Sequence, residues 1–216
     1  MKFKLPISLL FAASILISSV HAQTVKKIKK KISHGSYTTV DTYDVLKSNP
    51  DIKHGEYSST LVFTSEKGQY DNGKKIGVWR YYRNNIITQE YDADKKSLLL
   101  YEESKLIQNA WIIENGNVLK ETDARPVFLG GDDKIFEILL STIKHPGTLK
   151  GTNVLLATIT KEGKMINPKI ESKVGFGTDE EFLRIFNSLP QDWIPAYIDE
   201  KPIDSRIQLV LNFTAN

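Results

Sequence analysis

A glycine followed two residues later by an aromatic side chain recurs at near-constant spacing in the first half of the chain. The pattern reads HGSY at 34–37, HGEY at 54–57 and IGVW at 76–79, so its glycines lie 20 and 22 residues apart. A weaker copy, QNAW at 108–111, carries Ala110 in place of the glycine. Periods of this size are typical of arrays of small supersecondary units that bury one face against their neighbours. The first half of the chain is therefore expected to fold as a repeat array.

Alternation and turn residues indicate that each repeat is a β-hairpin. Over residues 57–64 the odd-numbered side chains share one face of an expected strand and the even-numbered ones share the other. Asn72-Gly73 suits a tight hairpin turn, because both central positions of that turn need a positive φ. We therefore expect an antiparallel hairpin-repeat sheet over residues 33–120, which resembles the MORN-like repeats of exported bacterial proteins.

The aromatic residues of these repeats have two interpretations. Rings that recur along a sheet stack on one another and supply its core. The same rings would also serve as a binding face for a glycan or a peptide. The residues concerned are Tyr37, Tyr57, Trp79, Tyr81 and Tyr82.

The N-terminus has the layout of a cleavable secretory signal. Lys2 and Lys4 precede an uncharged run from residue 5 to residue 20, and Ala22 stands at a suitable cleavage position. An apolar run of about sixteen residues is short for a membrane span of roughly twenty. We expect a signal peptide at 1–22, cleavage after Ala22 and a soluble periplasmic or secreted product. The alternative is an uncleaved membrane anchor.

A basic arm is expected next, at residues 23–32. Its five lysines would contact anionic lipid or nucleic acid, or form a solvated arm, and we favour the solvated arm. We therefore expect no nucleic acid partner and no stable membrane insertion after processing. The chain contains no cysteine, which excludes disulfides and lipid attachment at an N-terminal cysteine.

Residues 125–216 show a different pattern, with two amphipathic helices between strands. Apolar residues at 136, 139, 140 and 143 follow helical spacing and predict a helix over 132–143. Thr178 and Glu181 form a capping box that starts a second helix, and Pro190 ends it. Strands are expected at 154–160, 165–174 and 203–213. A polar linker near 120–125 separates this part from the repeats.

The order of these pieces resembles the C-terminal domain of TonB-type energy transducers. The resemblance gathers PVFLGG at 126–131, His145-Pro146 after the first helix, a turn at 162–164, Trp193 with Pro195, and the alternating last strand. It implies an α+β fold class, with a small domain at 125–216 in which two helices pack on a three-stranded antiparallel sheet.

The resemblance also implies a binding site on the last strand. In TonB-like domains this strand lies at or near a sheet edge and accepts an extended peptide, because an edge offers unpaired backbone groups. The alternative is that its polar side chains only face solvent. The expected peptide-binding residues are Ile203, Arg206, Ile207, Gln208, Leu209, Val210, Asn212 and Phe213.

The sequence contains no pattern typical of an enzyme. His34 and His54 occupy equivalent repeat positions, which favours a structural role, and His145 stands at an expected helix end. Nucleophile, zinc-protease and phosphate-loop motifs are absent. We therefore expect no catalytic residue, no metal and no cofactor.

The expected function is that of an exported, soluble interaction or adaptor protein. Its partner would be an extended peptide of an envelope protein, or a second copy of the chain paired strand to strand. One alternative is a TonB-type energy transducer of outer-membrane transport that is retained in the inner membrane. Another is a protein that binds or hydrolyses cell-wall material.

Overall fold

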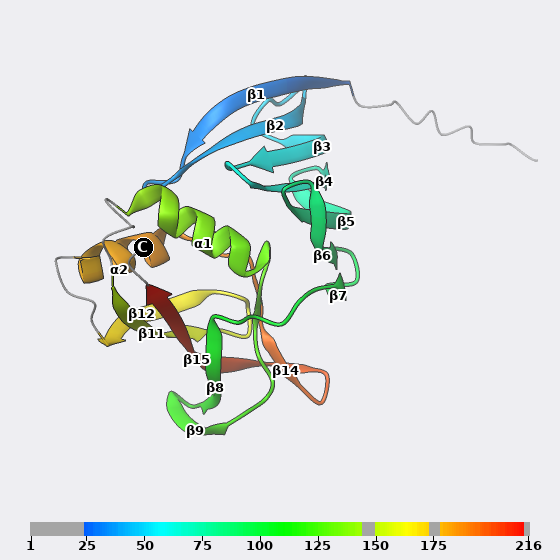
Figure 1. Cartoon of the computed structure of the whole chain (residues 1–216). Helices are drawn as coiled ribbons and strands as arrows, with labels where there is room; N and C mark the ends of the chain where they lie inside the picture. The colour runs from blue at the N-terminus through cyan, green and yellow to red at the C-terminus, as the bar shows by residue number, and fades with distance from the viewer. Residues whose placement is uncertain (1–23, 144–149, 173–177, 214–216) are drawn as a thin grey trace, which may run out of the picture.

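The computed structural model describes residues 24–143, 150–172 and 178–213 (Figure 1). The expected signal peptide at 1–22 and the His145-Pro146 pair lie outside these residues, as does the side chain of Thr178 in the expected capping box. Among the described residues no helix has both the length and the apolar character needed to cross a membrane.

The first half forms one seven-stranded sheet in which each strand pairs antiparallel with the next. The segment expected as a basic arm is its first strand. Asn72 and Gly73 both have positive φ at the β4–β5 turn, which confirms the predicted turn geometry. The strands are β1 (Val25–Ser33), β2 (Thr38–Leu46), β3 (Lys53–Thr60), β4 (Thr64–Asp71), β5 (Lys74–Arg83), β6 (Ile86–Asp92) and β7 (Ser97–Leu100).

The uninterrupted strand expected over residues 57–64 is wrong. β3 ends at Thr60, β4 begins at Thr64, and the amide of Leu61 donates to the carbonyl of Thr64 across the turn. The side chain of Val62 is therefore exposed at a hairpin tip.

A second sheet of six strands has the order β12-β11-β15-β8-β9, and β14 pairs with β15 beside this path. A short pair, β10 with β13, lies apart from it. The strands are β8 (Ile107–Glu114), β9 (Asn117–Glu121), β10 (Val127–Phe128), β11 (Gly151–Ile159), β12 (Met165–Ser172), β13 (Trp193–Ile194), β14 (Ala196–Ile198) and β15 (Lys201–Phe213).

The expected α+β class with a three-stranded sheet is wrong. Strands make up 59% of the described residues and helices 12%, and the two large antiparallel sheets have seven and six strands. The difference arises because the β8–β9 hairpin does not continue the first sheet. It pairs instead with β15, where Trp111 lies opposite Arg206.

Two helices occur in the described part of the chain, α1 (Gly131–Thr142) and α2 (Thr178–Ser188). α1 lies between the first sheet and the layer formed by α2 and the second sheet (Figure 1). It begins within one residue of the predicted start, but the predicted apolar face is only partly correct. Leu140 is about half exposed, whereas Lys134 and Glu137 are buried.

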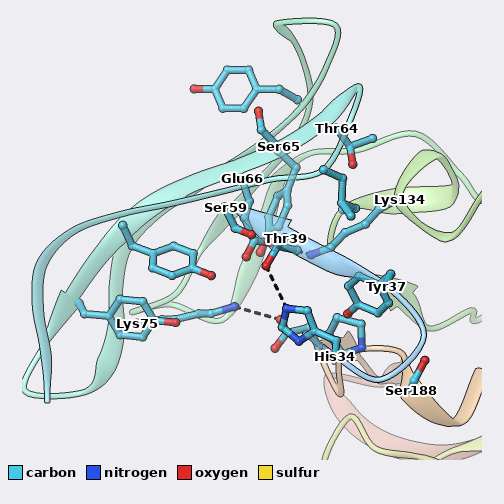
Figure 2. Close-up of a pocket in the computed structure, with 18 residues that line it drawn as sticks. His34, Tyr37, Thr39, Ser59, Thr64, Ser65, Glu66, Lys75, Lys134 and Ser188 are labelled. Atoms are coloured by element: carbon cyan, nitrogen blue, oxygen red, sulfur yellow. Dashed lines mark hydrogen bonds and ion pairs between the residues drawn. The ribbon is translucent and has the colours of Figure 1, made fainter. Parts of the chain in front are cut away.

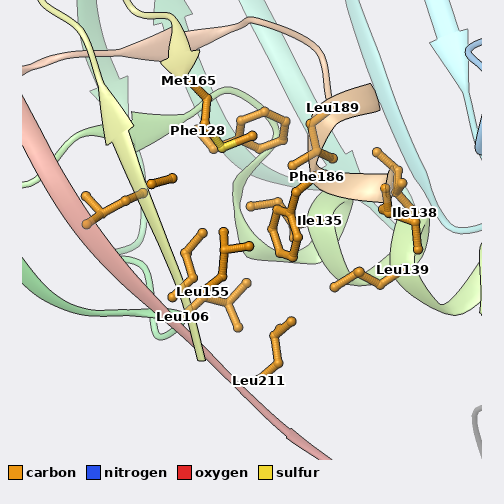
Figure 3. Close-up of a cluster of buried hydrophobic side chains, with 14 of the residues drawn as sticks. Leu106, Phe128, Ile135, Ile138, Leu139, Leu155, Met165, Phe186, Leu189 and Leu211 are labelled. Carbon is orange, nitrogen blue, oxygen red and sulfur yellow. The ribbon is translucent and has the colours of Figure 1, made fainter. Parts of the chain in front are cut away.

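The main core lies between the helices and the second sheet (Figure 3). Ile138 of α1, Phe186 of α2 and Leu155 of β11 are all fully buried there. A second cluster covers the inner face of the first sheet and includes Tyr57 and Trp79. α1 therefore has an apolar face toward one sheet and a polar face toward the other, and this second face forms one wall of a cavity.

Candidate functional site

The strand expected to bind a peptide is an interior strand. β15 pairs with β11 over residues 205–213, and residues 204–209 pair with β8 on the other side. The amide of Val210 donates to the carbonyl of Leu106. The sheet edges are β12 and β9, so the free backbone required for strand addition is not available over most of β15.

The side chains on β15 that were expected to bind a peptide are divided between core and surface. Ile207, Leu209 and their inward neighbour Leu211 are buried. Gln208 accepts a hydrogen bond from Asn109 and donates one to Glu171 on the strands around it. The structure therefore uses this strand to hold the second sheet together.

The concave site with the most converging polar groups lies between the first sheet and α1 (Figure 2). We call it the inter-layer pocket, a cavity of about 240 Å³. Strands β2 to β5 supply one wall, while α1 and the segment after α2 supply the other. Its rings are those of Tyr37, Tyr57, Tyr70, Tyr81 and Tyr82, together with His34.

Strand alternation places these side chains in the pocket. Thr39, Tyr57, Ser59, Glu66 and Tyr81 lie at inward positions of neighbouring antiparallel strands, and all five are buried. The repeat thus aligns polar and aromatic residues on one face of the sheet.

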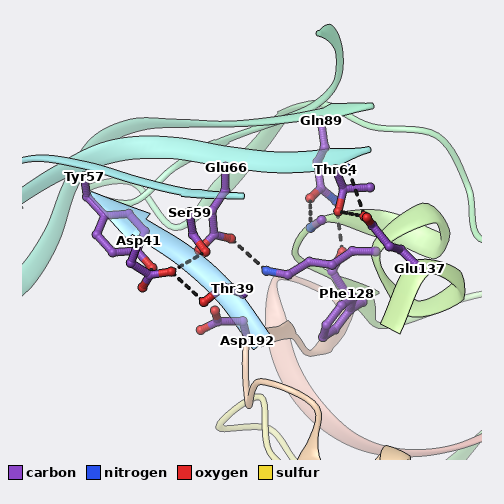
Figure 4. Close-up of polar contacts among 12 residues, drawn as sticks. Thr39, Asp41, Tyr57, Ser59, Thr64, Glu66, Gln89, Phe128, Glu137 and Asp192 are labelled. Atoms are coloured by element: carbon purple, nitrogen blue, oxygen red, sulfur yellow. Dashed lines mark hydrogen bonds and ion pairs between the residues drawn. The ribbon is translucent and has the colours of Figure 1, made fainter. Parts of the chain in front are cut away.

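A buried carboxylate lies behind the wall of the pocket (Figure 4). Asp41 accepts hydrogen bonds from the hydroxyls of Thr39, Tyr57 and Ser59, at 2.6, 2.9 and 2.8 Å. His34 Nε2 lies 3.0 Å from the same Thr39 hydroxyl. None of the ion pairs in the described part of the chain includes Asp41. The carboxylate is therefore held by neutral donors.

Two ion pairs join the layers across the pocket. Lys134 of α1 lies 2.8 Å from Glu66, and Lys75 lies 3.2 Å from Asp192. Burial alone would lower the pKa of Lys134, but the charge and hydrogen bond of Glu66 raise it. Burial alone would raise the pKa of Asp192, but Lys75 and then Lys134 hold it below its ordinary value. Lys134 and Asp192 are therefore charged at neutral pH.

Tyr57, Tyr70 and Tyr81 are protonated over the physiological range. Burial, followed by the charge of Glu66, raises the pKa values of Tyr57, Tyr70 and Tyr81. The Tyr81 hydroxyl is buried and makes no hydrogen bond to any described residue. Tyr81 is also one of the residues that line the pocket.

A hydroxyl lies between a carboxylate and an imidazole ring at one end of the pocket. Burial lowers the pKa of His34, so its ring is neutral near pH 7. The Thr39 hydroxyl donates to Asp41 and lies 3.0 Å from His34 Nε2. Among the described residues no group of three or more acidic, histidine or cysteine side chains could hold a metal ion.

Sequence reasoning identified four of the five tyrosines of this pocket but neither Tyr70 nor the charged groups. Tyr37 and Tyr57 come from the glycine–aromatic pattern and are buried, as is Tyr81, while Tyr82 is only partly buried. Lys134 and Asp192 lie far from the repeats in sequence and carry no local signal.

Comparison with known proteins gives no relative: no family model, curated protein or solved structure matches the chain.

Proposed function

We propose that this chain is an exported, non-catalytic binding protein of the bacterial envelope whose inter-layer pocket takes a small organic molecule. The observation that carries the proposal is Tyr81, a residue of the pocket lining whose hydroxyl is buried without a partner among the described residues. A buried polar group left unpaired costs about 1–3 kcal/mol. A ligand that accepts a hydrogen bond from Tyr81 recovers that energy.

The size and lining of the pocket support a small ligand with both polar and apolar surface. Its volume of about 240 Å³ lies below the roughly 300–1,000 Å³ of sites for drug-sized molecules. Rings supply apolar contact, and Ser59, Lys75 and Tyr81 supply polar groups. The alternative of hydrolysis is less well supported, because Glu66 and Asp192 are each paired with a lysine.

The export part of the proposal rests on the layout of residues 1–22. The peptide-adaptor role required a free edge at β15, and that strand is paired on both sides over residues 205–209. We therefore place the binding function in the pocket and not on the last strand.

The test is a ligand titration followed by fluorine NMR of protein labelled with 3-fluorotyrosine. The probes are N-acetylglucosamine, choline, glycine betaine and free amino acids. We expect at least one probe to shift the Tyr81 resonance in a saturable way. Tyr81→Phe should weaken its binding about fivefold, which corresponds to one lost hydrogen bond of about 1 kcal/mol.

Tyr91→Phe is the matched control, because Tyr91 is a partly buried tyrosine of the same sheet that does not line the pocket. It should leave binding unchanged. If no probe moves the Tyr81 resonance, or if both variants bind as the parent does, the pocket is not the binding site.

A further inference from the structure

An ammonium group already lies among three tyrosine rings beside the pocket. Lys53 Nζ is 4.4 Å from the ring centre of Tyr57, 5.0 Å from that of Tyr43 and 5.1 Å from that of Tyr70. These distances are within the roughly 6 Å over which a cation is attracted to an aromatic face. We call the three rings the tyrosine cage.

Lys53 fits this cage poorly. A primary ammonium carries three N–H donors, yet none of the hydrogen bonds or ion pairs of the described residues includes Lys53 Nζ. Ring faces attract the charge but do not replace the hydrogen bonds that the group makes in water. In agreement with this cost, burial lowers the pKa of Lys53.

A quaternary ammonium avoids this cost, because it has no N–H to satisfy and its methyl groups pack against rings. We infer that the tyrosine cage is the site for a quaternary ammonium group of the ligand, and that the Lys53 side chain occupies this site when the ligand is absent. The inference rests on the proposed function, because Tyr57 and Tyr70 also line the inter-layer pocket.

The carboxylates around the cage favour a cation more strongly than the neighbouring lysines oppose one. The Tyr57 hydroxyl donates to the buried carboxylate of Asp41, at 2.9 Å, and this carboxylate belongs to none of the described ion pairs. Lys30 Nζ lies 5.7 Å from the Tyr43 ring. Asp41 and Glu66 raise the pKa of Lys53 more than Lys75 and Lys30 lower it. When the Lys53 side chain moves from the cage into solvent, the cage loses a positive charge. A ligand cation bound in the cage replaces that charge.

The test compares choline with 3,3-dimethylbutan-1-ol, which has the same shape but a carbon atom in place of the charged nitrogen. Both are titrated into the full-length processed chain and followed by NMR. We expect choline to bind and to shift the resonances of Tyr57 and Tyr70. The neutral compound should bind at least roughly tenfold more weakly, because the attraction between a cation and the rings is lost.

Variants of the cage then test the role of Lys53. Lys53→Met removes the competing charge and keeps an apolar stem, so it should tighten choline binding roughly tenfold. Tyr70→Leu removes one ring of the cage, which is only partly buried, and should abolish that gain. Lys67→Met is the matched control, because Lys67 Nζ lies 5.2 Å from the Tyr82 ring, outside the cage.

The outcomes separate this inference from the proposed function. If another probe binds in a Tyr81-dependent way while choline and its neutral analogue bind equally, the pocket function stands and the ammonium site is refuted. If choline binds in a Tyr70-dependent way while Tyr81→Phe has no effect on any probe, the cage stands and the wider pocket proposal fails. If Lys53→Met binds choline as the parent does, Lys53 does not compete with the ligand for the cage. If Lys53→Met misfolds, Lys53→Gln takes its place, and unchanged choline affinity in that variant has the same meaning.

Discussion

At Gly68 the backbone of β4 lies directly against the indole ring of Trp79. A Cβ atom placed on Gly68 would lie 2.3 Å from two atoms of that ring, and Trp79 is fully buried in the core of the first sheet. We therefore expect Gly68→Ala to lower the free energy of unfolding by about 2 kcal/mol, the typical cost of overpacking a core. Urea denaturation followed by tryptophan fluorescence measures this loss.

A double-mutant cycle shows whether the Trp79 ring is the cause. In a Trp79→Leu background the contact is absent, so adding Gly68→Ala should cost less than about 0.5 kcal/mol. An equal cost in both backgrounds would mean that the alanine acts on the backbone of β4 instead. Gly68 is followed two residues later by Tyr70, but its contact with Trp79 depends on a cross-strand neighbour that the sequence alone does not show.

At the scale of elements, one carboxylate joins α1 to the first sheet. Glu137 accepts hydrogen bonds from the amides of Val62, Phe63 and Thr64 and from the Thr64 hydroxyl, and the Phe63 and Thr64 amides lie 2.7 and 2.8 Å away. Glu137 is only 1% exposed. We expect Glu137→Gln to lower the free energy of unfolding by about 3 kcal/mol, because a buried charged acceptor of several donors is replaced by a group that is partly a donor.

Amide hydrogen exchange locates the Glu137 effect. Residues 62–64 should exchange faster in Glu137→Gln, while the central strands of the second sheet lose protection only by the global change in stability. Asp133→Asn is the control, because its ion pair with Arg83 is partly exposed and such pairs contribute about 0–1 kcal/mol. A hairpin tip that stays protected in Glu137→Gln would show that other contacts dock the helix.

The elements that sequence predicted well are those with local signals. The Asn72-Gly73 turn, α1 and the second-half strands β11, β12 and β15 lie close to their expected positions. The partners of the strands were not predictable in this way, because alternation identifies a strand without identifying its sheet. The buried Glu137 illustrates the same limit. Helical periodicity favoured Leu140 for the core, whereas Glu137 is the residue that is buried. Phe63, one of its hydrogen-bond donors, lies 74 residues earlier in the sequence.

At the scale of the whole molecule, buried tyrosines fill much of the space between the first sheet and the helical layer. Tyr37 belongs to the main core although it precedes β2, whereas Tyr57 and Tyr81 belong to the cluster on the first sheet. Gln89 adds polar contacts across the layers through the carbonyl of Phe128 and the amide of Gly130. The layers therefore share their buried surface, and the ionisation of these tyrosines affects the stability of the entire fold.

This sharing predicts a cooperative unfolding at alkaline pH. Burial raises the pKa values of Tyr37, Tyr57 and Tyr81 in the folded chain. The stability that these protonated tyrosines contribute is therefore fully present below their pKa in the unfolded chain, which is about 10. As the pH rises above about 10, the unfolded chain loses these protons and the folded chain keeps them. Each tyrosine then removes about 1.4 kcal/mol of stability per pH unit.

Absorbance at 295 nm and circular dichroism, recorded together from pH 8 to 12, measure this prediction. The buried tyrosines should ionise in one steep step that coincides with the loss of the β-sheet signal. Replacing Tyr37 by Phe removes one of these ionisable groups, so the transition should become less steep by about one proton. The contrary result is that all tyrosines ionise near pH 10 while the circular dichroism signal is intact. The rings would then be accessible to hydroxide in the folded state. The interior shared by the two sheets would be less closed than the packing of Tyr57 and Tyr81 requires.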